Sequence, residues 1–206
     1  MTNAFGLERH DMERVLGNSG KDYIDFTGNV ETTFKKMSGL TEYWGGTLYN
    51  EIILKWNEVV PYLNAFMRNA GEAHNFMSGA VKGITEVDKN AVKKDPVDIQ
   101  HITRLQTKDD DKLNSTTERM RKDRDDMMRG ITEAMKYVDS VFGGLINSSA
   151  HSNEFDRAKE MMEKNHRRIK DGLMGVYDLV NKNMTTFADG YDEANRKIGN
   201  AVNDTK

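Results

Sequence analysis

Apolar residues recur at alternating steps of three and four residues over most of the chain, which predicts long two-faced helices. The longest unbroken series consists of Tyr49, Ile53, Trp56, Val60, Leu63, Met67, Ala70, His74, Met77, Val81 and Ile84. Such a series is typical of a helix that buries one stripe against partner helices. The spacing is unchanged on both sides of Pro61, so we expect the helix to bend there rather than to end.

Three further helices are predicted from the same period. The first begins near Thr2 or Leu7 and ends near Ser38, and the last covers residues 155–198. The third covers residues 95–138, with Asp95 as its cap and Pro96 at its first position. Its seam is weakest at residues 109–111, and Thr116, Thr117 and Arg124 stand where apolar residues are expected. These residues are either polar layers that set the register or part of a looser stretch.

Two aromatic-glycine elements separate the predicted helices. Trp44-Gly45-Gly46 lies within a predicted turn at residues 43–46, and Phe142-Gly143-Gly144 lies within a second at residues 141–144. The chain therefore divides into a helical hairpin over residues 1–94 and a second, degenerate hairpin over residues 95–206. We expect an all-α fold, namely an elongated antiparallel four-helix bundle built from two fused helix-turn-helix hairpins.

The two turns are expected at opposite ends of this rod, where Trp44 and Phe142 cap the core. Trp44, with its neighbours Tyr43 and Gly46, is expected to offer an exposed recognition surface.

Composition restricts the classes of function. The 206 residues are 31% charged and 37% hydrophobic, with two prolines and no strand-like alternation, which favours long helices over a sheet. The net charge is −3 with both signs interleaved, so we expect no nucleic-acid partner. Because the chain has no cysteine, disulfides and thiolate chemistry are excluded. We expect no secretory signal peptide and no membrane span.

No constellation typical of catalysis or metal binding is found. The five histidines lack the spacing of a helical metal site, and the acidic run at residues 109–111 lacks the spaced oxygens and glycine of a calcium loop. We therefore expect neither enzymatic activity nor a cofactor or metal. His74 and His166 fall on helix seams and are expected to face each other as a polar layer, with a pH-sensitive contact as the alternative.

A tryptophan-glycine-glycine turn between two long seams resembles the WXG-type (ESAT-like) family of type VII secretion proteins. The second half resembles a degenerate copy in which Phe142 replaces the tryptophan. Members are usually single hairpins that pair into four-helix bundles, and this chain looks like two of them fused. The resemblance implies export by a membrane-embedded ATPase, with the secretion ATPase or a co-secreted substrate as partners. A homodimer is also compatible with it, and membrane contact is left open.

The family's export signal is usually a tyrosine, three residues, then an acid. Phe187, Tyr191, Asp192 and Glu193 resemble a degenerate form, but Tyr191 is followed four residues later by Asn195. The resemblance implies a secretion substrate, a co-secreted partner or a targeting chaperone, which is secreted, on the cell surface or in the bacterial cytoplasm. The alternatives are a structural coiled-coil rod component and a membrane-active helical effector.

Overall fold

The computed structural model describes residues 9–87, 95–110, 114–147 and 153–203. Four helices account for most of them: α1 (Arg9–Leu40), α2 (Thr47–Val87), α3 (Thr117–Ile146) and α4 (Asn153–Asn203). No β-strand occurs in these four ranges. The predicted helix start at Thr2 or Leu7 and the boundary at residue 94 lie outside the described residues.

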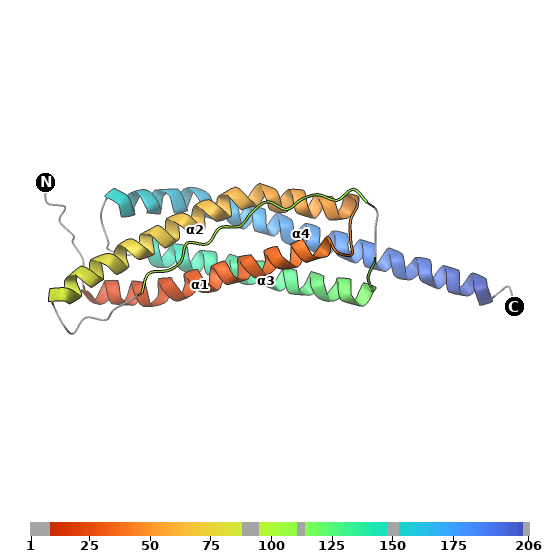
Figure 1. Cartoon of the computed structure of the whole chain (residues 1–206), viewed down its shortest axis with the longest axis horizontal. Coiled ribbons are helices and arrows are strands. Elements are labelled where there is room, and N and C mark those ends of the chain that lie inside the picture. The colour runs from red at the N-terminus through yellow and green to blue at the C-terminus, as the bar shows by residue number, and fades with distance from the viewer. Residues whose placement is uncertain (1–8, 88–94, 111–113, 148–152, 204–206) are drawn as a thin grey trace.

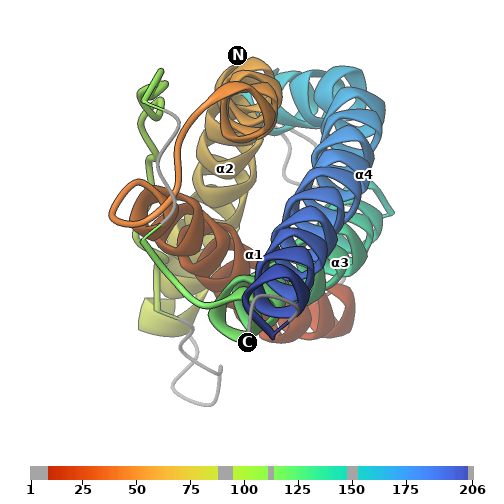
Figure 2. The same cartoon turned by 90° about the vertical axis from the view of Figure 1, so that its right-hand side faces the viewer.

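The helices form an elongated antiparallel bundle, which confirms the predicted fold class (Figure 1). α2 packs mainly on α4, α1 mainly on α3, and α3 also packs along α4, whereas α1 and α2 touch each other little. Each half of the chain therefore packs chiefly against the other half. Seen end-on, the helices surround a common core, and a non-helical segment runs outside α1 and α2 (Figure 2).

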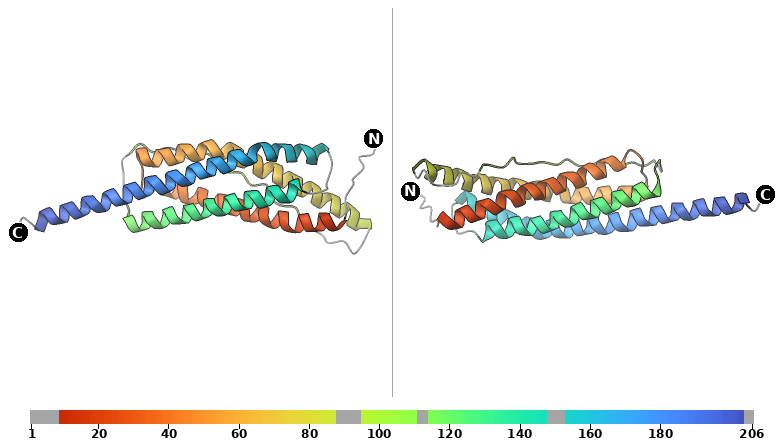
Figure 3. Two further views of the ribbon diagram at one scale, coloured as in Figure 1. Left: turned by 180° about the vertical axis from the view of Figure 1, so that it is seen from behind. Right: turned by 90° about the horizontal axis from the view of Figure 1, so that it is seen from below.

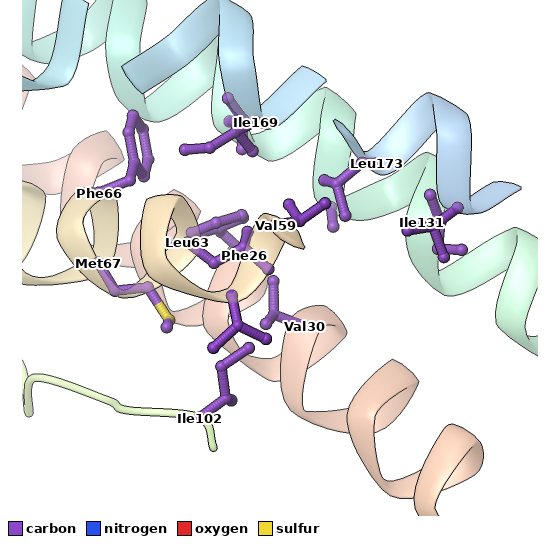
Figure 4. Packing of buried hydrophobic residues seen from close by; sticks show 14 of the residues in the cluster. Phe26, Val30, Val59, Leu63, Phe66, Met67, Ile102, Ile131, Ile169 and Leu173 are labelled. Carbon is purple, nitrogen blue, oxygen red and sulfur yellow. The ribbon is translucent and has the colours of Figure 1, made fainter. Parts of the chain in front are cut away.

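The core is one continuous apolar cluster contributed by all four helices. Phe26 of α1 and Phe66 of α2 meet edge to face, with ring centroids 5.4 Å apart. Ile169 and Leu173 of α4 extend toward the same interior (Figure 4). Burying side chains of this size stabilises a fold by about 1.5–3 kcal/mol each, so the seams outweigh the low helix propensity of their glycines.

α2 contains the whole predicted series from Tyr49 to Ile84. The helix continues through Pro61, whose side chain is exposed. α4 likewise covers the predicted residues 155–198 and continues to Asn203. These helices were predictable because their apolar stripes are uninterrupted.

The predicted third helix is wrong over residues 95–110 and 114–116. Residues 95–110 are extended, and α3 begins only at Thr117. Its cap is Thr116, whose side chain accepts a hydrogen bond of 3.2 Å from the N–H of Arg119. The extended form is favoured because side chains of α2 bind the backbone of residues 95–110, as described below.

The predicted turn at residues 141–144 is also wrong. Phe142, Gly143 and Gly144 are helical, and α3 ends at Ile146 with the N–H of Asn147 bonded to the carbonyl of Gly143 at 3.2 Å. A glycine inside a helix costs only about 1 kcal/mol. Burial of Val141 and Leu145 on either side of the pair outweighs that cost.

Candidate interaction site at the Trp-Gly-Gly turn

Residues 95–110, which we call the strap, run alongside α1 and α2 (Figure 1), and we call the surface of these two helices that contacts the strap the groove. The strap runs antiparallel to α2 and ends beside the turn that joins α1 to α2. Val97 and Ile102 are buried and Leu105 packs against the core, while most residues between them are exposed. The strap therefore presents one apolar face to the bundle and one polar face to solvent.

Four asparagines of α2, which we call the asparagine ladder, hold the strap. The pairs are Asn75 with Val97, Asn64 with Ile102, Asn57 with Leu105 and Asn50 with Lys108. In the first three pairs the side-chain oxygen accepts from the backbone N–H at 2.7–3.0 Å, and the side-chain nitrogen donates to the carbonyl of the same residue at 2.8–2.9 Å. Asn50 accepts from the N–H of Lys108 at 2.7 Å and donates to the carboxylate of Asp109 at 2.9 Å.

The spacing of the ladder matches that of an extended chain. Asn50, Asn57 and Asn64 stand seven residues apart, about 10.5 Å along a helix, while three extended residues span about 10 Å. Asn75 follows eleven residues later, about 16.5 Å, which five extended residues also span. The ladder was missed from sequence, although the seven-residue recurrence of asparagine beside an apolar seam was a usable signal.

The strap ends on the Trp-Gly-Gly turn. The N–H of Gly46 donates to the carbonyl of Lys108, and the N–H of Asn114 donates to the carbonyl of Tyr43, both at 2.8 Å. A side chain at position 45 would overlap the backbone carbonyl of Asp110, and Gly46 has a φ of 91°, which side chains rarely adopt. Both glycines are therefore required, one for the close approach of the strap and one for the turn.

Trp44 and Tyr43 are buried, so the predicted exposed recognition surface is wrong. Trp44 is 0% exposed and lies edge to face on Tyr49, with ring centroids 5.8 Å apart. Tyr43 donates to the carboxylate of Asp123 at 2.8 Å, and burial and this bond raise the pKa of the phenol. Gly46 is buried too. Phe187 of α4 packs on Trp44, while Arg119 and Asp123 of α3 contact Tyr43.

The residues of the predicted tail signal lie beside this turn. The ring of Phe187 packs on Trp44, with centroids 5.5 Å apart, and Ala188 is buried, whereas residues 189–201 are partly or fully exposed. α4 then continues past the other helices (Figure 3). Tyr191 is 41% exposed, and Glu193 is exposed and pairs with Lys197 one turn later.

Arg121 of α3 fixes the start of this extension. Its guanidinium bonds to the carboxylates of Asp189 and Asp192, both at 2.8 Å. The bond to Arg121 and another from Thr117 hold the pKa of Asp192 below its usual value. The turn of the first hairpin, the start of α3 and the extension of α4 therefore meet at one end of the bundle.

Phe142 lies near the C-terminal end of α3, away from the turn. Its ring stacks on His166 at a centroid distance of 4.2 Å, and the ring nitrogen Nε2 of His166 lies 2.7 Å from Asp139. Burial raises the pKa of Asp139, but bonds from Lys170 and His166 outweigh this effect and lower it. Gly143 and Gly144 are helical here and take no part in a turn.

His74 and His166 do not face each other, so the predicted polar layer is wrong. Nδ1 of His74 lies 3.0 Å from the hydroxyl of Ser19, and Nε2 lies 3.4 Å from the carbonyl of Asp95. A carbonyl only accepts, so Nε2 carries the proton and the Ser19 hydroxyl donates to Nδ1. Burial lowers the pKa of His74, and the bond to Asp95 partly offsets this.

The fold and this site define a class: an α-helical bundle of two hairpins, joined by an extended strap that is bound through its main chain. Within the four described ranges, no three acidic or histidine side chains gather as a metal site would require. None of the described helices is long and apolar enough to cross a membrane. Comparison with family models, curated proteins and solved structures finds no match.

Proposed function

We propose that this chain is a non-enzymatic component of a type VII secretion system, acting through protein–protein contacts as a substrate, a co-secreted partner or a targeting chaperone. The observation that supports this most is the contact of Trp44, in the Trp-Gly-Gly turn, with Phe187, which lies in α4 just before the α4 extension begins. The two sequence features that resemble the secretion family, far apart in the chain, thus form one end of one bundle.

In this proposal the two features have different roles. Trp44 is buried and positions α4, so it acts by packing rather than by contact with a partner. The α4 extension is the part that a partner reads, because an exposed single helix offers side chains on every side. Tyr191 and Glu193 are its recognition residues, and Arg121 orients the helix through Asp189 and Asp192.

The test is an export assay in the encoding bacterium, with the secretion ATPase present or deleted. We expect the chain, or a partner that depends on it, in the medium only when the ATPase is present. Combined Tyr191→Ala and Glu193→Ala replacement is expected to reduce export at least about tenfold at equal cellular levels. Ile24→Ala is the matched control, because Ile24 is 61% exposed on α1.

Export that is independent of the ATPase would contradict the proposal. So would the lack of any effect of the ATPase on either the chain or a co-purified partner. In that event, fibres of the purified protein would favour a structural rod component, and leakage of liposomes would favour a membrane-active effector.

A further inference from the structure

We propose that the groove between α1 and α2, with its asparagine ladder, is a binding site for an extended peptide segment of a partner protein. In the isolated chain the strap fills this site as an internal ligand. The inference goes beyond the proposed function, because it depends on the ladder alone and stands whether or not the chain is exported.

The ladder recognises a main chain rather than particular side chains. Three asparagines each bind the N–H and the carbonyl of a single residue: Val97, Ile102 and Leu105. These are the two bonds that a neighbouring strand supplies when a peptide joins the edge of a sheet. The site therefore selects an extended conformation, and it excludes proline at the three bonded positions because proline has no N–H.

α1 and the first turn of α2 complete the groove. The hydroxyl of Tyr23 accepts from the N–H of Gln100 at 3.4 Å, and the hydroxyl of Tyr49 donates to the carbonyl of Gln106 at 3.3 Å. Both bonds again go to the main chain. Most polar contacts in the groove therefore suit any extended peptide, and the exceptions use the side chains of His101, Lys108 and Asp109.

The apolar part of the site defines the chemistry of the occupant. Val97 and Ile102 are buried, and Leu105 packs on the core. Ile102 points toward Met67 of α2 (Figure 4). The residues between them are largely exposed. The fitting partner segment has aliphatic side chains at positions one, six and nine, and tolerates polar residues elsewhere.

In this proposal the strap leaves its site while the four helices stay packed. α1 and α2 make few direct contacts, so the strap rather than helix packing closes this side. It lies at the perimeter, outside α1 and α2, with its outer face in solvent (Figure 2). Release of the strap exposes a groove that is already lined with paired donors and acceptors.

The test uses the full chain with a weakened strap, Val97→Asp combined with Ile102→Asp. A labelled peptide with the sequence of residues 95–110 is titrated against it, and fluorescence anisotropy is measured. We expect binding at least about tenfold tighter than to the wild-type chain, whose groove is occupied. Adding Asn57→Leu and Asn64→Leu is expected to weaken binding at least about tenfold.

Two matched controls isolate the ladder. Asn181→Leu with Asn195→Leu replaces two exposed asparagines of α4, and binding is expected to be unchanged. A peptide with proline in place of Ile102 is expected to lose binding, whereas alanine in place of the exposed Arg104 is expected to have no effect.

Failure of the peptide to bind a strap-weakened chain that keeps its helical circular dichroism would overturn the proposal. So would binding that does not depend on the ladder. If the strap variant fails to fold, hydrogen exchange of the wild-type chain tests the proposal instead, by comparing the exchange of the strap amides with that of the helical core. Amides of Val97, Ile102 and Leu105 that exchange only with the helical core would show that the strap never leaves. A wild-type dimer held through exchanged straps would assign the groove to a second copy and also overturn the proposal.

Discussion

The ring of Trp44, in the turn between α1 and α2, packs on the ring of Phe187 in α4, with centroids 5.5 Å apart and planes inclined by 55°. This contact joins the turn of the first hairpin to the last helix of the second. Trp44 is therefore a packing residue of the whole bundle. An exposed Trp44 would contribute little to the free energy of unfolding, whereas a buried one contributes much, so the two roles can be distinguished by measurement.

Replacing Trp44 with alanine is expected to lower the free energy of unfolding by about 3–5 kcal/mol, since a fully buried large ring leaves a cavity. Urea denaturation followed by circular dichroism gives this value. The control is Leu54→Ala on α2, where the side chain is 56% exposed and a change within about 0.5 kcal/mol is expected. A loss below about 1 kcal/mol for the Trp44 variant would contradict the buried position.

Gly45→Ala is expected to destabilise the protein by about 1–3 kcal/mol, because the added methyl group overlaps the carbonyl of Asp110 and displaces the strap. Gly39→Ala is the matched control. Position 39 is helical with open space around it, so alanine is expected to stabilise the protein by about 0.5–1 kcal/mol. Thermal unfolding of the two variants should move in opposite directions. Equal shifts would show that the strap does not reach the turn.

The stability of the protein is expected to fall as the pH drops below about 6.5, the ordinary pKa of histidine, because burial holds the pKa of His74 below that value. Above this pH the ring is neutral in both the folded and the unfolded chain, so it has no effect on stability. Below it the unfolded chain binds a proton that the folded chain does not. The free energy of unfolding then falls by up to about 1.4 kcal/mol per pH unit, until the pKa of the folded state is reached.

Urea denaturation at pH 7.5 and 5.5 tests this pH dependence. His74→Gln keeps a group able to bond Ser19 but does not titrate, so the loss between these two pH values should shrink. Asp139 contributes to the pH dependence of stability in a separate, more acidic pH range. Its lowered pKa gives stability that is present above pH 3.8 and lost below it. An unchanged pH dependence in the His74 variant would assign the loss to another group.

The α4 extension predicts the length of the molecule in solution. A helix of 51 residues is about 77 Å long, so the maximum dimension from X-ray scattering is expected to exceed this value. Deleting residues from Gly190 onward is expected to shorten the particle by about 20 Å while leaving its helical core intact. A compact particle would show that α4 folds back on the bundle.

The apolar seams were readable from sequence because a helix repeats every 3.6 residues and its stripe depends only on nearby positions. α2 is the clearest example, since its series contains no polar gap apart from His74. Residues 95–110 carry Ile99, Ile102 and Leu105 at helical spacing, so sequence alone placed them in a helix. Their extended form depends on the asparagine ladder of α2. Its members lie 22, 38, 48 and 58 residues away in sequence from the strap residues that they bind.

The candidate site was likewise predicted only in part from the sequence. The Trp-Gly-Gly element was recognisable as a turn because two glycines in succession mark a sharp change of direction. The same signal failed at Gly143 and Gly144, where burial of Val141 and Leu145 outweighs a small glycine penalty. Whether an aromatic beside a glycine pair is exposed depends on which helix crosses it, and Trp44 is covered by α4.

The sequence by itself determined the helical class, the extent of α2 and α4, and the position of the first turn, because each depends on local periodicity or backbone freedom. Only the tertiary structure decided that the strap is extended, that Trp44 is buried and that α4 projects beyond its neighbours. Those outcomes depend on hydrogen bonds and packing between residues far apart in the chain, whose free energies exceed the weak local preferences of the segments involved.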